Sequence, residues 1–109
     1  MLFVTNDRCV EHTAGEMHPE SPQRLRAVFA ALDRADLREA VTLVEAPKAP
    51  LELLAGVHTQ DLVDMIQAVS ARGGGRIDMD TVVAPASFDA ARYAAGAGLE
   101  SIERLGRGE

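Results

Sequence analysis

The stretch from Glu11 to Leu25 reads EHTAGEMHPESPQRL and marks the passage from a polar loop into a helix. It gathers two histidines, three carboxylates and two prolines, which is typical of a loop at the rim of a site. Ser21 is a preferred helix N-cap, and Pro22 suits the first helical position. The stretch therefore predicts a helix from about Pro22 to Ala35.

Apolar residues recur along this predicted helix at helical spacing. They are Leu25, Val28, Phe29 and Leu32. Because residues three and four apart share one face of a helix, we expect this stripe to belong to the core.

Two short β-branched runs flank the helix. Leu2 to Thr5 ends at Asn6-Asp7 and is typical of a buried strand followed by a turn, and Val41 to Val44 predicts a second strand. A helix between two strands favours a parallel pair and an α/β fold class. Two or three short strands cannot form a self-sufficient sheet with both faces covered, so we expect the sheet to be incomplete.

The rest of the chain predicts three helices and one extended segment. In order these are a short helix over Leu51–Ala55, a helix capped by Thr59 and ended by Gly73-Gly74-Gly75, an extended segment over Asp78–Pro85, and a helix over Phe88–Leu105 capped by Ser87. We interpret the triple glycine as a flexible surface loop, since it lacks the spacing of a phosphate-binding loop.

Small residues crowd the last predicted helix. They are Ala90, Ala91, Ala94, Ala95, Gly96, Ala97 and Gly98. Glycine costs a helix about 1 kcal/mol relative to alanine, so this surface indicates the close approach of another backbone, which we expect to be a sheet.

Composition excludes several classes of protein. The 109 residues carry a formal net charge of -6, which argues against nucleic-acid binding, and no apolar run is long enough to span a membrane. The single cysteine, Cys9, excludes an internal disulfide, and the N-terminus lacks the features of a signal peptide. We expect a cytoplasmic protein with a thin, alanine-rich core.

Four segments together resemble one protein family. They are HPESPQRLRAV at 18–28, preceded by Asp7-Arg8-Cys9 and His12; VHTQDLV at 57–63; DMDT at 78–81; and SFDAARYAAGA at 87–97. In this order they are similar to the N-terminal signature of the histone deacetylase and acetoin-utilisation family, in particular its bacterial, class II-like members. The resemblance covers nearly the whole chain.

The resemblance implies a zinc-dependent deacetylase with an arginase-like, three-layer α/β fold around a parallel sheet. Such an enzyme hydrolyses N-acetyl amides on lysine-like or polyamine substrates, using zinc to activate water and a tandem histidine pair as general acid and base. This chain has no His-His pair and no Asp-x-His pair. We therefore expect residues 1–109 to form the N-terminal fragment of a deacetylase domain, inactive and free of zinc when alone, whose partner is the missing C-terminal part.

The resemblance also implies substrate-side roles for four residues, and no catalytic or metal-binding ones. Pro19 and Glu20 would lie at the pocket rim, Arg24 would point toward the channel at the foot of the acetyl pocket, and Asp80 would accept hydrogen bonds from the substrate backbone. Structural roles remain open beside these. The prolines can fix the loop, Glu20 can favour the helix N-terminus, and Arg24 can cover the helix surface.

Two further hypotheses concern the same loops. Cys9, His12, His18 and Glu20 could supply zinc ligands, but their spacing fits no standard pattern, so we expect no metal site there. Asp78 is interpreted as a solvated loop charge.

One alternative from a different functional class stays open. The chain could be a small non-catalytic α/β binding or oligomerisation module that pairs with itself or with a partner through its Ala/Gly-rich helix. Cooperative unfolding as a soluble monomer would favour this module, and molten behaviour would favour the fragment.

Overall fold

A computed structural model describes residues 1–109, and one of its two small sheets is a parallel pair of strands. β1 (Leu2–Thr5) pairs with β2 (Thr42–Glu45), so that Leu2 lies opposite Thr42 and Thr5 opposite Glu45. Both strands fall where the β-branched runs predicted them. Between them the chain passes through α1 (Pro22–Arg34) and the short 3₁₀ helices η1 (Asp7–Glu11) and η2 (Arg38–Ala40).

Asn6 closes the carboxyl end of this strand pair. Its side-chain nitrogen donates to the carbonyl of Ala46 at 2.9 Å, and its side-chain oxygen accepts the N–H of Arg8 at 3.0 Å. The first bond ties β1 to the segment after β2, and the second caps η1. Buried polar side chains are stable only when paired in this way, so Asn6 fixes the point where the chain turns away from the sheet.

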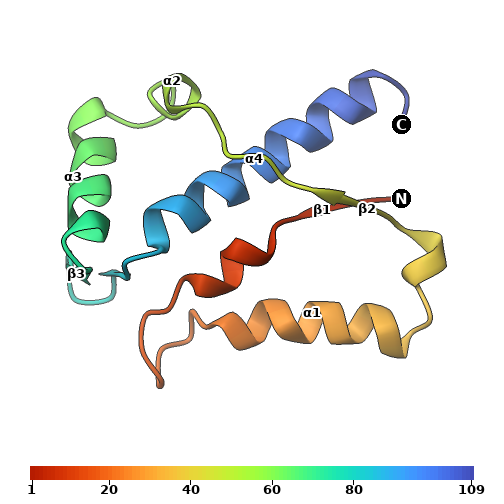
Figure 1. The fold of residues 1–109 in the computed structure, drawn as a ribbon, viewed down its shortest axis with the longest axis horizontal. Helices are drawn as coiled ribbons and strands as arrows, with labels where there is room; N and C mark the ends of the chain where they lie inside the picture. Colours follow the sequence, from red (N-terminus) through yellow and green to blue (C-terminus); the bar gives the residue numbers. More distant parts are fainter.

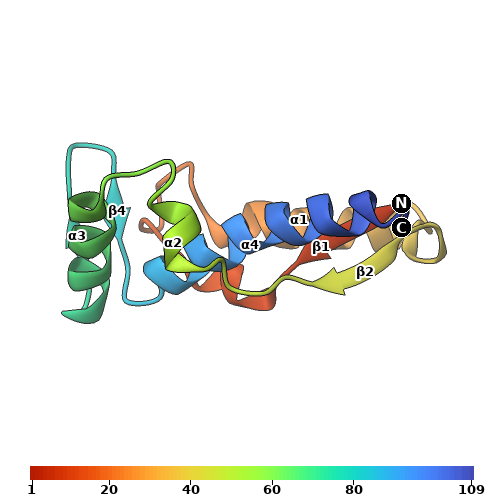
Figure 2. The ribbon, with the colours of Figure 1, turned by 90° about the horizontal axis from the view of Figure 1, so that it is seen from above.

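The second half of the chain adds three helices and a hairpin. In order these are α2 (Leu51–Leu54), α3 (Gln60–Ala71), β3 (Gly75–Arg76), β4 (Val82–Val83) and α4 (Ser87–Gly106). α4 runs diagonally across the molecule against β1 and η1, while α3 stands at the far end beside β4 (Figure 1). Seen from above, the molecule is long and flat, with the α3 end separated from the strand pair (Figure 2). No helix has the length and apolar character needed to cross a lipid bilayer.

Gly96 lets α4 approach the loop after β2. A Cβ atom at this position would lie 1.8 Å from the carbonyl oxygen of Pro47. Beside it, Ala49 and Arg92 exchange two hydrogen bonds, from Ala49 N–H to the Arg92 carbonyl at 2.9 Å and from Arg92 Nε to the Ala49 carbonyl at 3.0 Å. The predicted close approach is therefore confirmed: at Gly96 the partner is the loop after β2, and α4 also lies against strand β1 of the sheet.

Lys48 reinforces this docking of the loop on α4. Its ammonium group pairs with Asp89 at 2.8 Å and lies 5.4 Å from the centre of the Tyr93 ring. Both partners belong to α4, one turn apart, so the loop is held by polar contacts around the tight contact at Gly96.

Three helices end in the same hydrogen-bond pattern, the Schellman motif. At the end of α3, the N–H of Gly74 donates to the carbonyl of Val69 and that of Gly73 to Ser70, with positive φ angles of 105° at Gly73 and 93° at Gly74. The interpretation of the triple glycine as a flexible loop is corrected here: it caps α3, and Gly75 belongs to β3.

α1 and α4 end with the same motif. In α1 the residue in the left-handed conformation is Asp36, with φ of 53°, and the N–H of Leu37 donates to the carbonyl of Leu32. In α4 the corresponding residue is Gly108, with φ of 83°. Each motif satisfies carbonyl groups that a helix end otherwise leaves unpaired.

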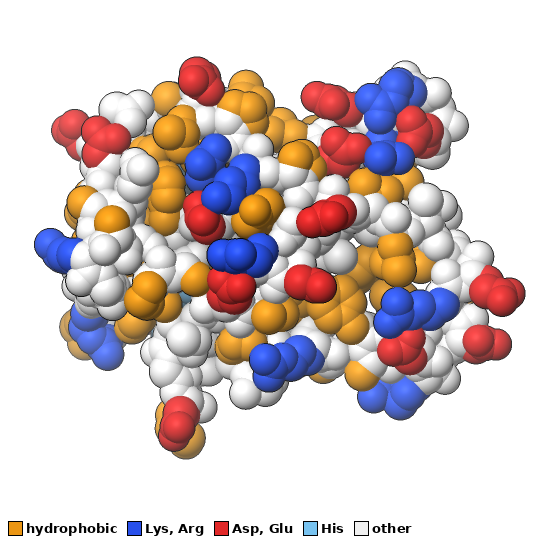
Figure 3. Space-filling model, in the orientation of Figure 1, with side chains coloured by type: hydrophobic (Ala, Val, Ile, Leu, Met, Phe, Trp, Pro, Cys, Tyr) orange, Lys and Arg blue, Asp and Glu red, His pale blue; other side chains and the backbone are white.

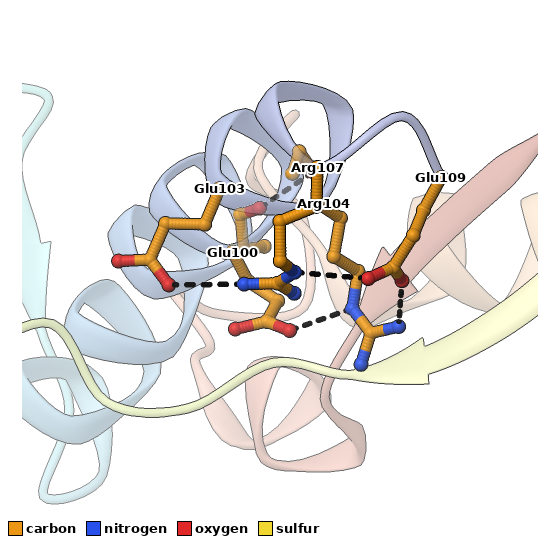
Figure 4. A network of polar contacts seen from close by, with 7 residues as sticks. Glu100, Glu103, Arg104, Arg107 and Glu109 are labelled. Carbon is orange, nitrogen blue, oxygen red and sulfur yellow. Dashed lines mark hydrogen bonds and ion pairs between the residues drawn. The ribbon is translucent and has the colours of Figure 1, made fainter.

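A network of charged side chains covers the end of α4 (Figure 4). Arg104 pairs with Glu100 at 2.6 Å and with Glu109 at 2.7 Å, and Arg107 pairs with Glu109 at 2.9 Å. The hydrogen bond from Arg107, with the charge of Arg104, lowers the pKa of Glu109. The same alternation of charge extends over the face drawn in Figure 3, where acidic and basic side chains are interspersed among exposed hydrophobic ones.

The core is thin, as the composition predicts. Only 14 of the 109 residues are buried, and no large side chain is fully enclosed. The stripe on α1 is only partly in the core: Leu32 is buried and Phe29 meets Phe3 edge to face at 6.0 Å, but Val28 stays 46% exposed. The prediction that the whole stripe is core was wrong because α1 lies against η1 and leaves part of its apolar face uncovered.

Candidate functional site

Glu20 and Arg24 lie together at the start of α1. Their side chains form an ion pair one helical turn apart, and both are more than half exposed. Exposed pairs of this kind contribute little stability, so the pair chiefly orients the two groups. Ser21 occupies the N-cap position as predicted, although its side chain makes no capping hydrogen bond, and Pro22 begins the helix as predicted.

Both residues line an open cavity of about 390 Å³ between η1 and α1. Its wall consists of Cys9, His12, Glu20, Ser21, Pro22, Arg24, Leu25 and Val28. Among the four predicted site residues, Glu20 and Arg24 border this cavity and Pro19 and Asp80 do not.

Cys9 is the nucleophilic side chain in the cavity wall. Burial raises the pKa of its thiol, and a hydrogen bond with Asn6 opposes this effect without overcoming it. Since the thiolate is the nucleophile, a raised pKa argues against a reactive cysteine.

His12 also lies in the cavity wall and is tied to the start of α4. Its Nδ1 is 2.7 Å from the hydroxyl of Ser87, and that hydroxyl accepts the N–H of Ala84 at 2.7 Å. Ser87 was predicted to be the N-cap of the last helix, but it is the first helical residue, and Ala86 precedes it as N-cap. The Ser87 hydroxyl therefore contacts His12 in the loop after η1 and Ala84 in the turn before α4.

Asp80 lies in the turn between β3 and β4, and this turn is ordered by Asp78. One carboxylate oxygen of Asp78 accepts the N–H of Thr81 at 2.7 Å and that of Asp80 at 3.1 Å. The pKa of Asp78 is lowered chiefly by a hydrogen bond with the Thr81 side chain, and the backbone N–H groups of Asp80 and Thr81 lower it further. Asp78 is an exposed loop charge, as predicted, and its carboxylate also shapes the turn that presents Asp80.

His18 joins the two loops that carry the predicted site residues. Its Nδ1 lies 3.0 Å from the backbone nitrogen of Glu20, and its Nε2 lies 3.1 Å from the backbone carbonyl of Asp80. Pro19 stands between His18 and Glu20 and is exposed. The structure thus brings Pro19, Glu20 and Asp80 to adjoining loops, with Arg24 behind Glu20 on α1.

The bridging role of His18 was not foreseen from the sequence. The residue belongs to the HPE segment of the resemblance, which was the available signal, but its partner is 62 positions away. No local pattern specifies that pairing.

Nowhere in the structure are three or more His, Cys, Asp or Glu side chains grouped so that they could hold a metal ion. Within the group weighed from the sequence, His12 is directed to Ser87 at the start of α4, whereas His18 is directed to Asp80 in the turn between β3 and β4. The residues of this chain therefore do not fit a zinc centre.

Comparison with known proteins matches residues 18–109 to the histone deacetylase domain. A histone deacetylase-like amidohydrolase from Pseudomonas aeruginosa is 32% identical over 100 residues, covering 92% of this chain and 26% of that protein. A probable deacetylase from Methanothermobacter thermautotrophicus is 34% identical over 88 residues, covering 81% of this chain and 26% of that protein.

A solved structure agrees with these relatives. The HDA15 HD domain matches with a TM-score of 0.79 at 32% identity, covering 88% of this chain and 29% of that one. The chain thus spans about a quarter of the length of the two curated relatives described above.

Proposed function

The chain belongs to the histone deacetylase domain family, and from this premise we propose that it forms the N-terminal portion of a zinc-dependent deacetylase. The reaction would be hydrolysis of N-acetyl amides on lysine-like or polyamine amines. The observation that carries the proposal is the family match over residues 18–109, which includes Pro19, Glu20, Arg24 and Asp80. Residues 1–109 would form one part of a single deacetylase domain.

The four residues would act on the substrate side. Pro19 and Glu20 would border the entrance, and the carboxylate of Asp80 would accept hydrogen bonds from substrate N–H groups, for which an ionised carboxylate is a strong acceptor. Arg24 would face the inner end of the pocket. In support, Glu20 and Arg24 border one cavity, and a hydrogen bond of His18 links the loop that carries Glu20 to the turn of Asp80.

We assign no bond-making step to this chain. Its residues hold no metal-ligand set, and the sequence contains no tandem histidine pair to act as general acid and base. The zinc ligands and proton-transfer groups would come from residues outside these 109.

The shape of the molecule supports a covering partner, which we propose to be the rest of the same domain. Its radius of gyration is 15.4 Å, against about 13 Å for a compact domain of this length. On α4, Ile102 and Leu105 stay 70% and 64% exposed. Apolar surface of this kind marks contact areas.

The test is to read the gene on both sides of these 109 codons, express the complete reading frame, and assay metal-dependent release of acetate from acetyl-lysine peptides and acetylpolyamines. We expect activity from the complete protein and none from the 109-residue chain. A complete protein that deacetylates neither substrate contradicts the function. Metal-dependent activity of the 109 residues alone contradicts the placement of the chemistry outside them.

A non-catalytic binding or oligomerisation module is the second candidate, and one observation favours it. Every buried side-chain nitrogen and oxygen has a hydrogen-bond partner, so the chain is locally self-consistent. Urea unfolding of the isolated chain separates the candidates: a cooperative transition of a monomer supports the module, and a broad transition with dye-binding apolar surface supports the portion of a larger domain.

A further inference from the structure

His18 supplies the only hydrogen bond between the loop before α1 and the turn between β3 and β4. The two loops are far apart in sequence, and each is ordered by its own contacts: Glu20 pairs with Arg24, and Asp78 holds the backbone of Asp80. The ring of His18 stands at the junction.

The partners of the ring define its chemical state. A backbone N–H can only donate, so the Nδ1 atom that faces the N–H of Glu20 must offer a lone pair. A carbonyl can only accept, so the Nε2 atom that faces the carbonyl of Asp80 must carry the hydrogen. Only the neutral ring with its hydrogen on Nε2 makes both bonds.

We propose that His18, in this tautomer, is the positioning residue of the substrate entrance. It sets the spacing between Glu20 and the turn of Asp80 without itself touching the reacting atoms. This inference rests on the proposed function, because the entrance is the one assigned there to Pro19, Glu20 and Asp80. Loss of the bridge would leave both loops folded but free to move apart.

Two substitutions separate the two bonds of His18. In His18→Asn, the side-chain oxygen can still accept the N–H two residues ahead, as in an Asx turn, but the shorter side chain cannot reach Asp80. In His18→Ala, both bonds are lost. His58→Ala is the matched control, since His58 is an exposed histidine that makes no side-chain hydrogen bond.

The readouts on the full 109-residue chain are spectroscopic. Long-range ¹H–¹⁵N spectra report the tautomer of His18, nuclear Overhauser contacts report the proximity of its loop to residues 79–81, and amide exchange reports the N–H of Glu20. We expect the Nε2–H tautomer in the unsubstituted chain. His18→Asn should lose the contacts between the loops and keep slow exchange at Glu20.

His18→Ala should lose the contacts between the loops. The amide hydrogen of Glu20 should exchange about tenfold faster, which corresponds to the free energy of about one net hydrogen bond. The control should change neither. A hydrogen on Nδ1, or contacts between the loops that persist in His18→Asn, overturns the proposal.

In the complete reading frame, His18→Asn should raise KM about threefold to tenfold and leave kcat within about twofold, since positioning of the entrance affects binding of the substrate. An unchanged KM in an active enzyme overturns the positioning role and leaves the proposed function standing. If the complete protein has no activity, the proposed function fails, and the spectra still decide whether the bridge exists.

Discussion

Gly96 is the residue at which the fold leaves least room for a side chain. A Cβ atom there would meet the carbonyl of Pro47 at 1.8 Å, and the backbone of the loop would have to move. We expect Gly96→Ala to lower the free energy of unfolding by about 1–3 kcal/mol, measured by urea denaturation.

Gly98 provides the control two residues along the same helix. A Cβ atom there meets nothing within 4 Å, so Gly98→Ala should raise the free energy of unfolding by about 0.5–1 kcal/mol through helix propensity alone. Equal effects of the two substitutions would show that Gly96 is not a point of close approach.

Asp36 holds the left-handed conformation at the end of α1, where glycine is the preferred residue. Asp36→Gly should raise the free energy of unfolding by about 0.5–1 kcal/mol, because glycine adopts a positive φ without steric cost. Thermal denaturation measures the change. Asp36→Ala keeps the strained conformation and should give no gain, so stabilisation by alanine would point to another cause.

At the scale of elements, Ser70 connects α3 to the start of α4. Its hydroxyl lies 2.7 Å from the carbonyl of Pro85 and 3.1 Å from that of Ala84, and it accepts the N–H of Phe88 at 3.3 Å. Because Ser70 is buried, Ser70→Ala should cost about 1–3 kcal/mol in chemical denaturation.

Ser101→Ala is the comparison for this substitution. The Ser101 hydroxyl bonds only to Ala97 within α4, so its removal should change stability by less than about 0.5 kcal/mol. A loss of unfolding free energy as large as that of Ser70→Ala would contradict the inference that the hydrogen bonds from α3 to the start of α4 contribute more stability than a bond within α4.

The turn between β3 and β4 should depend on pH through Asp78. Its pKa is lower in the folded chain than in the unfolded one, so its contribution is present above the ordinary aspartate pKa of about 3.9 and is lost as the pH falls through the lower value. We expect the amide signals of Asp80 and Thr81 to shift together below about pH 4. In Asp78→Asn, which keeps an oxygen acceptor but no charge, this transition should be absent.

Elements were predictable from the sequence where the signals were local. Pro22 at the start of α1, Thr59 at the N-cap of α3 and the glycines after Ala71 act on their neighbours in the chain, and these boundaries are confirmed to within a few residues. Ser87 was assigned wrongly because capping and non-local bonds use the same hydroxyl, and the sequence does not tell them apart.

The candidate site was predictable only in part for the same reason. The family and the α/β fold with a small parallel sheet are confirmed. The substrate roles of Pro19, Glu20, Arg24 and Asp80 remain predictions. The contacts that relate these residues, above all His18 with Asp80, join segments far apart in the chain, and no local propensity encodes them.

At the scale of the whole molecule, the exposed apolar side chains near the end of α4 should promote self-association of the isolated 109-residue chain, in which the partner proposed to cover them is missing. We expect the double substitution Ile102→Gln with Leu105→Gln to reduce association in sedimentation at high concentration. Stability should change by less than about 0.5 kcal/mol, because both side chains are mostly exposed. Leu32→Gln, at a buried position, should instead destabilise strongly. Unchanged association of the double variant would place the contact elsewhere.

The docking of the loop after β2 has a practical consequence for optical work. The sequence contains one tyrosine and no tryptophan, so ultraviolet emission of the chain comes almost entirely from Tyr93, because the three phenylalanines emit only weakly. Its ring lies under the ammonium group of Lys48, beside the contact of Gly96 with Pro47. The intrinsic fluorescence of the unlabelled chain therefore reports directly on whether this loop is seated on α4.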